Sequence, residues 1–370
     1  MAALLVSSAY SDLVSPVVWI VAAYLGLAFP VFLLSAILWT LLLLAARHWK
    51  LALFMLVCFA GISPRLQRYF PFRYSRPQPF VNTMTVGGRI TTTPVDTFRI
   101  LTYNTRGLGD AHLNLETEPL PVMDLVQESE ADVVFLQEYA FSNRKNGHTE
   151  EKLRERVKEQ YPYYHFLRNS NRQFMGIVLY SKWPILTEVK IDTCSTDYTW
   201  AMYYEIDYRG RKVALVNCHL ESTRLSNENR KLYKAQARHF ESDSLARMQD
   251  GLRQLKPSFL ERTRQTSIIN RFLNTRMIAS ENVPLLICGD LNDTPISFTY
   301  HSLRRDLGDA WVEAGYGPGV TYREIPFLFR IDHVFHSSQF HALRARVLRE
   351  IKASDHYPVM VDFQLLPDTD

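Results

Sequence analysis

The sequence has few cysteines, little net charge and no visible internal repeat. Its 370 residues include four cysteines, which do not make the disulfide framework of a small secreted domain. The formal net charge of +4 is too small to indicate nucleic-acid binding by itself. Hydrophobic residues make up 47% of the chain and charged residues 22%, so the composition excludes a disordered protein. The length allows one large domain or two ordinary ones.

Charge is almost absent from the first part of the chain. No charged residue occurs from Pro16 to Ala46, and Ser15 followed by Pro16 is typical of a helix start. At about 1.5 Å per residue this run would be about 45 Å long as a helix, more than the roughly 30 Å hydrocarbon core of a bilayer. We therefore expect a spanning helix that is tilted or bent, with Pro30 at the bend. A cleaved signal peptide is not expected, because the run is too long and no basic segment precedes it.

A second apolar run, Leu51–Ile62, follows a polar break at residues 47–50 that includes an interfacial tryptophan. It is short for a span unless its flanking residues snorkel. Met1–Tyr10 is also apolar, as if the chain began late or its first helix were very short. We expect residues 1–63 to form a membrane anchor of two apolar helices, or three, so that the protein is an integral membrane protein in contact with the lipid bilayer.

Residues 64–96 carry several prolines and arginines and show no long periodic run. They are predicted to be a basic, proline-containing linker next to the membrane. Two interpretations of the positive charge stay open: it contacts anionic headgroups, or it is retained for topology.

From residue 97 the pattern changes to short strands and helices, and residues 97–370 are predicted to form one catalytic domain. Helical spacing predicts helices over 120–129 and 150–160, and the long polar stretch 225–275 is also helical in spacing. Cys218 and Cys288 lie in predicted strands, where a cysteine acts as a small buried hydrophobe. The predicted strands are 98–103, 132–137, 163–167, 176–180, 185–191, 200–208, 212–219, 285–288, 330–336, 345–351 and 359–363.

Polar side chains follow several of these strands at the point where the apolar run ends. Carboxylate, amide and imidazole groups recur there, which predicts one shared site at one edge of a β-sandwich. The residues concerned are Asn104, Gln137 with Glu138, His219, Asp290 with Asn292, Asp332, and Asp355 with His356.

Taken in this order, the series resembles the endonuclease/exonuclease/phosphatase superfamily, the DNase I-like metal-dependent phosphoesterases. The resemblance covers residues 97–366, and its specificity lies in the series, because the segments 289–292 and 354–356 are weak motifs singly. It implies an α+β fold, a four-layer α/β-sandwich of two packed mixed β-sheets flanked by helices, here preceded by N-terminal transmembrane helices. It also implies a pseudo-symmetric pair of sheets, which the sequence itself does not display.

The resemblance implies a metal site. Glu138 matches the metal-binding Glu at a strand end, Asn104 matches the metal-proximal Asn, and Asp355 is expected to complete the metal shell. Carboxylate oxygens suit a hard cation, so Mg²⁺ is the expected cofactor, with Mn²⁺ as a possible substitute.

The resemblance also implies a set of catalytic residues. His356 matches the general base, and Asp332 matches the carboxylate that fixes its tautomer and stabilises its protonated form. Asp290 and Asn292 match the residues that orient the attacking water and hold the phosphate. His219 matches a second histidine that contacts the scissile phosphate.

The membrane orientation is open on charge alone. Arg47 and Lys50 lie on one side of the second apolar run, and the arginines at 65, 68, 73 and 76 lie on the other. If two helices span, the positive-inside rule puts the catalytic domain in the cytoplasm. Membrane-anchored members of the family often have three helices, which places this domain outside, and we favour the extracytoplasmic side.

Three functions agree with these features. The first is a membrane-anchored, Mg²⁺-dependent phosphodiesterase of the nuclease type, in which a His-activated water attacks the phosphoester. The alternative is a phospholipid hydrolase on the same fold, of the sphingomyelinase or phosphoinositide phosphatase type. A catalytically silent, membrane-tethered binding module is the third. The expected partner is a phosphoester substrate, either nucleic acid or phospholipid, and no protein partner is inferable from the sequence.

Overall fold

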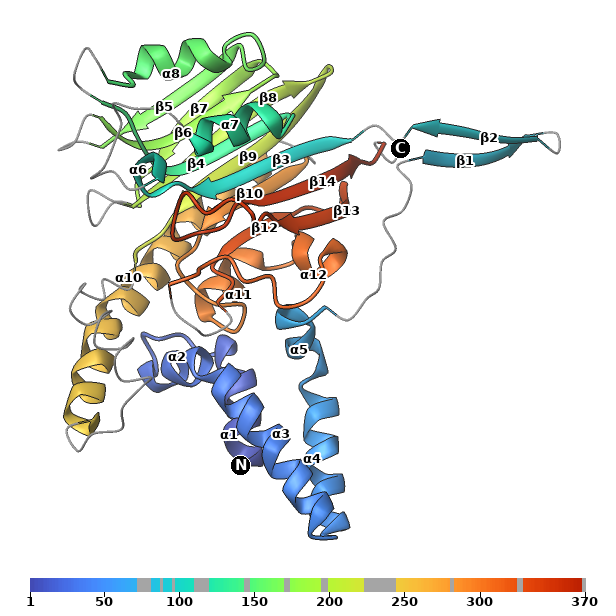
Figure 1. Ribbon diagram of the computed structural model, residues 1–370, viewed down its shortest axis with the longest axis vertical. Helices are drawn as coiled ribbons and strands as arrows, with labels where there is room; N and C mark the ends of the chain where they lie inside the picture. The colour runs from blue at the N-terminus through green and yellow to red at the C-terminus, as the bar shows by residue number, and fades with distance from the viewer. Residues whose placement is uncertain are drawn as a thin grey trace.

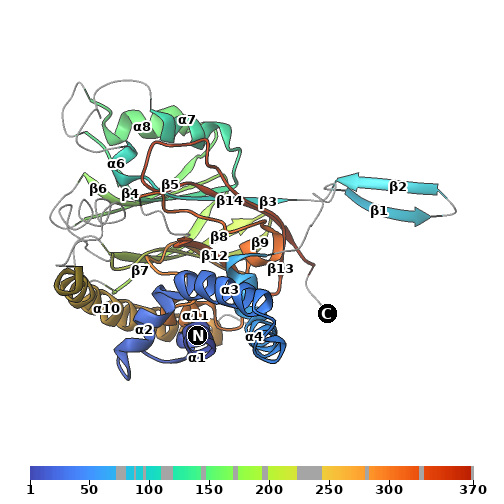
Figure 2. The ribbon, with the colours of Figure 1, turned by 60° about the horizontal axis from the view of Figure 1, so that its bottom comes forward.

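Two six-stranded sheets pack face to face, and helices cover the outer face of each (Figures 1 and 2). The computed structural model describes residues 1–71, 81–86, 89–94, 97–109, 120–142, 147–169, 174–193, 199–222, 244–279, 283–324 and 329–367. This is the predicted four-layer α/β-sandwich. Figure 2 shows the N-terminal helices on the same side of the sandwich as α10 and α11.

The first sheet has the strand order β13-β14-β3-β4-β6-β5, and the second has the order β11-β12-β10-β9-β8-β7. In each sheet one parallel pair, β3 with β4 or β10 with β9, has antiparallel neighbours on both sides. This shared pattern is the pseudo-symmetry that the resemblance implied. The strands are β3 (Phe98–Asn104), β4 (Val133–Ala140), β5 (Tyr163–Arg168), β6 (Met175–Ser181), β7 (Ile185–Ile191), β8 (Trp200–Tyr208), β9 (Arg211–His219), β10 (Leu285–Asp290), β11 (Gly308–Asp309), β12 (Asp332–His336), β13 (Phe340–Val347) and β14 (Val359–Leu365).

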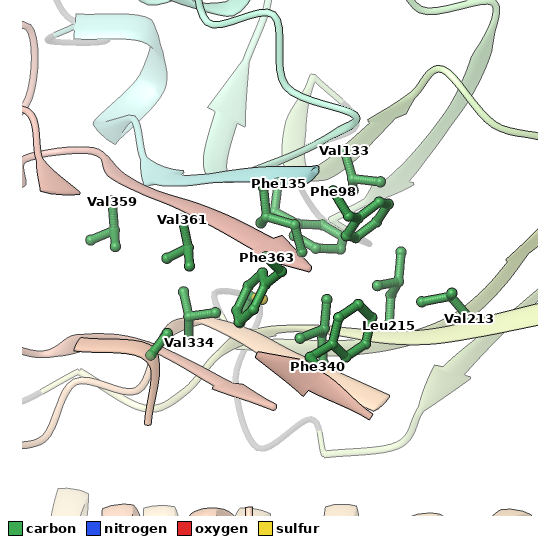
Figure 3. Packing of buried hydrophobic residues seen from close by; sticks show 14 of the residues in the cluster. Phe98, Val133, Phe135, Val213, Leu215, Val334, Phe340, Val359, Val361 and Phe363 are labelled. Atoms are coloured by element: carbon green, nitrogen blue, oxygen red, sulfur yellow. The ribbon is translucent and has the colours of Figure 1, made fainter. Parts of the chain in front are cut away.

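Three apolar clusters hold the layers together. The largest lies between the sheets and includes Phe98, Phe135, Leu215 and Phe363 (Figure 3). A second packs the first sheet against α7 and α8, and a third packs the second sheet against α10 and α11. The helices of the catalytic domain are α6 (Arg106–Gly109), α7 (Pro121–Glu128), α8 (Glu150–Val157), α10 (Ser244–Ala279), α11 (Phe298–Arg304) and α12 (Ala310–Ala314).

Most predicted strands are present within one to three residues of their predicted ends, but the prediction for 345–351 was wrong. The strand there, β13, begins at Phe340 and ends at Val347. Its pairing with β14 shifts between Ala342 and Arg344, and this bulge breaks the alternation that would have revealed the first half of the strand. Of the predicted helix 225–275, residues 244–275 belong to α10, and 225–243 lie outside the described residues.

The N-terminal segment is helical but contains no single long helix. Its helices are α1 (Ala2–Ala9), α2 (Ile20–Leu27), α3 (Phe29–Ala45), α4 (Trp49–Gly61) and α5 (Ser63–Tyr69), with a short 3₁₀ turn η1 (Ser11–Leu13) after α1. Among the described residues, no helix alone combines the length and apolar composition of a membrane span. Two pairs of consecutive helices have this length and composition when each pair is taken together. The first pair, α2 and α3, is bent by 59°, and the second, α4 and α5, is bent by 64°.

The expected helix from Pro16 to Ala46 is therefore broken. Residues 16–18 form a turn, so Ser15 does not cap a helix that starts at Pro16. The second break lies at Ala28, two residues before Pro30. A proline inside a helix has no N–H to donate and clashes with the carbonyl of the fourth preceding residue, so the chain starts a new helix there.

The segment predicted as a linker, 64–96, also carries regular structure. Its first residues belong to α5, and β1 (Val81–Val86) pairs with β2 (Arg89–Pro94) in a separate two-stranded sheet. The short α5 begins with Pro64 in its first turn, a position that proline tolerates.

Truncation of Phe135 tests the layer between the sheets. Its ring is fully buried and packs near Tyr204 of the opposite sheet. We expect Phe135→Ala to lower the free energy of unfolding by about 3–5 kcal/mol in chemical denaturation, because it leaves a cavity. Leu186→Ala, at a side chain that is 52% exposed, is the control and should change it by less than about 0.5 kcal/mol. Equal losses in the two variants would contradict the placement of this core.

Candidate active site

The predicted polar residues meet where the parallel strands of both sheets end. In one sheet, His219 of β9, Asp290 of β10 and Asp332 of β12 lie side by side in register. In the other, Asn104 ends β3. Its Nδ2 donates hydrogen bonds to Glu138 Oε1 (3.1 Å) and to Asp290 Oδ2 (3.0 Å), so the two sheets are joined at this edge.

A β-bulge aims Glu138 into the site. The register of β4 against β6 shifts between Leu136 and Tyr139. Glu138 has φ of 48°, in the left-handed region that residues other than glycine rarely adopt. Bulges re-aim side chains next to active sites, and strained backbone collects there. The carboxylate of Glu138 stays 29% exposed, so it is reachable from solvent.

The end of β10 places Asp290 and Asn292 on the same side. Gly289 has φ of 128°, and a Cβ at this position would clash with the carbonyl oxygen of Cys218 on β9. Only glycine therefore allows β9 and β10 to approach here. Asn292, with φ of 52°, donates its N–H to Asp290 Oδ1 (2.8 Å) and its Nδ2 to the carbonyl of Leu220 (2.9 Å).

His356 and Asp332 form a buried pair. His356 Nδ1 lies 2.9 Å from Asp332 Oδ2, and the two side chains are 6% and 1% exposed. The other ring nitrogen, Nε2, lies 3.7 Å from Asp290 Oδ2. Ser354 Oγ accepts the His356 N–H (3.2 Å), which fixes the backbone before β14. The bond to Asp332 sets the tautomer and leaves Nε2 to face the site.

The buried charges shift each other's pKa values. Burial lowers the pKa of His356, but the carboxylates of Asp332 and Asp290 outweigh it and raise the pKa to about 10. Burial raises the pKa of Asp290 to about 6, with a further rise from Asp332, although His356 and His219 oppose it. In the absence of another cation, His356 therefore carries the positive charge of this cluster at neutral pH.

Asp355 lies beside the cluster and is tied to Arg106. Its Oδ2 is 3.6 Å from Arg106 Nη1, and its Oδ1 lies 3.3 Å from Ser354 Oγ. Arg106 has φ of 45° and donates its N–H to Asn104 Oδ1 (3.2 Å). The structure thus places a partly exposed guanidinium next to the predicted metal residues.

His219 and Asp332 carry buried polar atoms that need a partner. Within the described part of the chain, the two ring nitrogens of His219 make no hydrogen bond, and the same holds for Oδ1 of Asp332. His219 stacks on Trp200 and points Nε2 toward Glu138 Oε1 (3.4 Å) and Asp290 Oδ2 (3.8 Å). Unpaired buried polar atoms at an active-site edge are typical of positions that meet a ligand, an ion or ordered water.

The donor set fits a hard divalent cation. Oxygen atoms of Glu138 and Asp290 both lie within hydrogen-bond distance of the same amide nitrogen, and carboxylates are the preferred ligands of Mg²⁺. The structure also gathers a different group: Asp290, Asp332 and His356 each offer one buried ligand atom, all within 4.8 Å of one another. That second group already contains its own positive charge on His356.

Two further residues, Gln137 and Tyr322, support the site, although neither was assigned a role in it from the sequence. Gln137 Nε2 donates to Asn217 Oδ1 (2.8 Å) and to Thr102 Oγ1 (3.1 Å), which forms a polar bridge between the sheets directly under the site. Tyr322 pairs with His356 in an isolated β-bridge and places its ring 5.1 Å away. The sequence offered a reason to consider Gln137, because it is a polar residue at the end of an apolar strand, beside Glu138. Nothing in the sequence pointed to a contact between Tyr322 and His356.

Comparison with protein families gives two matches. The model of the Endonuclease/Exonuclease/phosphatase family matches residues 101–356. The model of a domain of unknown function (DUF8431) matches residues 1–69, the segment that ends with α5. None of the curated protein sequences compared with the chain matches it.

Solved structures share the fold. An endonuclease/exonuclease/phosphatase family protein from Bacteroides thetaiotaomicron is 17% identical with a TM-score of 0.51, covering 74% of this chain and 100% of its own. The catalytic domain of human Nocturnin, with bound sulfate, is 16% identical with a TM-score of 0.50, covering 78% and 98%. An endonuclease/exonuclease/phosphatase from Beutenbergia cavernae is 18% identical with a TM-score of 0.50, covering 73% and 72%. At these identities the likeness shows the fold alone.

The raised pKa of His356 predicts how the stability of the metal-free protein depends on pH. A group whose folded-state pKa is raised stabilises the fold fully below its unfolded pKa and loses that effect as the pH rises through the folded pKa. Relative to His356→Gln, the wild-type chain in excess chelator should be more stable near pH 6.5. This advantage in unfolding free energy should shrink as the pH approaches 10. A constant difference across this window would contradict the ion pair with Asp332.

Proposed function

The chain belongs to the endonuclease/exonuclease/phosphatase family of metal-dependent phosphoric ester hydrolases, and on that premise we propose that it is a membrane-anchored, Mg²⁺-dependent phosphodiesterase. One observation carries the proposal. Asn104 and Glu138 of one sheet, with His356 from the segment before β14 of that sheet, meet Asp290 and Asp332 of the other sheet at a single edge. A binding module without catalytic function has no chemical need for these buried charges.

Glu138, with Asn104 and Asp355, is the proposed metal site. The carboxylate of Glu138 is partly exposed, and only the amide of Asn104 and the ring of His219 face it among its described contacts. A divalent cation held there would supply positive charge for the phosphoryl oxygens and would lower the pKa of His356. We assign the buried group of Asp290, Asp332 and His356 to proton transfer. Its negative charges are already balanced in part by His356, so it needs a metal ion less than Glu138 does.

His356 is the proposed general base. Its Nδ1–H donates to Asp332 Oδ2, so its Nε2 is the atom that takes the proton from the attacking water. Asp290 orients that water, and its carboxylate is itself held by the amides of Asn104 and Asn292 (3.0 and 3.2 Å). Preorganised groups of this kind add no reorganisation at the moment of reaction.

His219 and Arg106 are proposed to face the phosphate. His219 has both ring nitrogens available within the described residues, and Trp200 fixes its plane. A guanidinium can donate two parallel hydrogen bonds to phosphate oxygens, and that of Arg106 is partly exposed beside Asp355. These two side chains would hold the phosphoryl oxygens that do not react.

A phospholipid substrate is the second candidate. The observation that favours it is the apolar surface of the N-terminal helices, which would keep the site next to lipid headgroups. The exposed apolar side chains there are Val31, Leu34, Ile37, Leu38, Trp39, Leu41 and Leu42 on α3, and Trp49, Leu51, Leu53, Phe54, Leu56 and Val57 on α4. Many exposed apolar side chains on two neighbouring helices are typical of a membrane contact.

The catalytic proposal is tested with the full-length protein in detergent micelles. Single- and double-stranded DNA, RNA, sphingomyelin and phosphoinositides are offered with Mg²⁺ and with excess chelator. We expect Mg²⁺-dependent hydrolysis of at least one of them, and the preferred substrate distinguishes the two candidates. Glu138→Gln should abolish turnover and weaken Mg²⁺ binding, and His356→Ala should lower kcat by at least about 10²-fold, the contribution of a positioned base.

Glu188→Gln is the matched control, because Glu188 is a half-exposed carboxylate on β7, outside the site. It should leave turnover unchanged. Full activity of the wild-type protein in excess chelator, or of Glu138→Gln with Mg²⁺, would rule out the proposed metal site.

The membrane proposal concerns α3 and α4, which lie side by side and run away from the sandwich (Figure 1). With 17 and 13 residues they are about 25 and 20 Å long, somewhat shorter than the roughly 30 Å hydrocarbon core. The exposed Arg47 lies in their connection, and the exposed Lys50 lies in the first turn of α4. We propose that this hairpin is embedded in the bilayer with its tip toward the cytoplasm, which leaves the catalytic domain on the extracytoplasmic side, as the three-helix members of the family suggest. By the positive-inside rule alone, the arginines that follow α4 favour the opposite side, so the labelling experiment below decides the orientation.

Two measurements check this arrangement. The full-length protein should stay in the membrane pellet after carbonate extraction. Cysteine introduced as Tyr316→Cys, at a site 73% exposed on the catalytic domain, should react with an impermeant reagent in intact cells. Lys50→Cys should react only after permeabilisation, and a Cys58→Ala parent without either substitution gives the background. Recovery in the soluble fraction would contradict the anchor, and the reverse labelling pattern would contradict the orientation.

A further inference from the structure

The N-terminal helices hold a buried charge. Asp12 is the only acidic residue among the first 95, and it is fully buried in the turn after α1. Arg68 of α5 donates to it through Nη1 at 2.7 Å, and Arg65 lies 3.4 Å away. A buried carboxylate is costly unless it is paired. The ion pair therefore closes residues 1–69 into one unit, from the turn after α1 to the end of α5.

The same guanidinium reaches into the catalytic domain. Nη1 of Arg68 also donates to the carbonyl oxygen of Pro295 (3.3 Å). The backbone carbonyl of Arg68 accepts Nη2 of Arg330 (2.9 Å), a buried arginine that is paired with Asp309 (2.8 Å). His333, next to Asp332 in β12, lies between Arg330 and the backbone carbonyl of Asp293. Arg68 is thus held from both sides by buried groups of the catalytic domain.

The contact of Arg68 with Pro295 falls on the loop that starts at the active site. This loop, residues 291–297, begins next to Asp290 and carries Asn292. At its far end Ile296 is fully buried in the apolar cluster of the N-terminal helices. Gly26 of α2 packs so tightly here that a Cβ would clash with the carbonyl oxygen of Ile296. One end of the loop therefore positions site residues, and the other end rests on residues 1–69.

We propose that Arg68 is a positioning residue of the phosphoesterase site, and that residues 1–69 act as a docked support for the loop 291–297. This inference rests on the proposed function, because the loop that is supported carries Asn292 and begins next to Asp290, the residues proposed to orient the water and hold the phosphate. Asp293 in the middle of the loop is anchored to the catalytic domain by Arg262 (3.0 Å) and Thr299 (2.8 Å). The docked unit adds support at Pro295 and Ile296. The N-terminal helices are then part of the catalytic apparatus as well as an anchor.

Two pairs of variants in the full-length protein test this support. Gly26→Ala pushes α2 and the loop apart, whereas Gly61→Ala on α4 is the control, because a Cβ there meets nothing within 4 Å. Arg68→Gln removes the contact with Pro295. Arg65→Gln is its control, since the Arg65 guanidinium contacts Asp12 and Tyr10 within the N-terminal unit.

Hydrogen exchange of the peptide 291–297 gives a readout that does not need activity. In both Gly26→Ala and Arg68→Gln it should be faster by at least about tenfold, and in both controls it should equal that of the wild type. Arg68→Lys, which keeps a donor for Asp12 and Pro295, should restore most of the protection. Unchanged exchange in Gly26→Ala and Arg68→Gln would overturn the proposal. If Arg68→Gln fails to fold, Gly26→Ala decides alone.

Kinetics on bis(p-nitrophenyl) phosphate with Mg²⁺ then connect the loop to the reaction. We expect kcat per folded molecule to fall by about 10- to 10²-fold in Gly26→Ala and Arg68→Gln, the scale of a misplaced catalytic group, with KM nearly unchanged. A loss of activity that only matches the loss of folded protein would overturn the positioning role. If the wild-type protein hydrolyses no phosphoester while the variants still exchange faster as expected, the proposed function is rejected. The support of the loop by residues 1–69 would then still stand.

Discussion

The site depends on the apolar layer between the two sheets. Phe98, Phe135, Leu215 and Phe363 fill this layer and set how closely the sheets approach. At one edge the layer gives way to polar groups, where Gln137 bridges to Asn217 and, beyond it, Asn104 bridges to Asp290. These hydrogen bonds need donors and acceptors within about 3 Å of each other, which the packed sheets provide.

Charge in the site is concentrated and nearly sealed from water. Asp290, Asp332 and His356 are each almost fully buried, so their mutual interactions are weakly screened. The result is an imidazole with a strongly raised pKa that would be a poor base alone. The same carboxylates that hold the proton on His356 also attract a cation. In the proposed mechanism, a cation bound nearby would favour the neutral form of His356.

The N-terminal helices differ from a simple tether because hydrogen bonds of Arg68 cross the boundary to the catalytic domain. Asp12 is neutralised by Arg68, whose backbone in turn satisfies the buried Arg330. Breaking this chain would leave buried charges without partners, which costs several kcal/mol. The structure therefore places the last helix of the N-terminal unit, α5, as a fixed element between the other N-terminal helices and the sandwich.

The sequence by itself determined the order of the strands and the identity of the polar residues at their ends. A strand is recognisable wherever a short apolar run ends in a turn, and Asp290, Asn292 and His356 each follow or precede such a run. It also showed that charge is missing from Pro16 to Ala46. These features are local, and local patterns are visible without knowledge of the fold.

The tertiary structure alone decided which groups touch. The bulge that aims Glu138 and the bulge that hides the start of β13 depend on the partner strand, which the sequence does not specify at a given residue. The burial of Asp12 depends on its contact with Arg68, and the burial of Ile296 depends on the N-terminal helices, both far away in the chain. Such contacts are set by packing over long sequence separations, so no local pattern announces them.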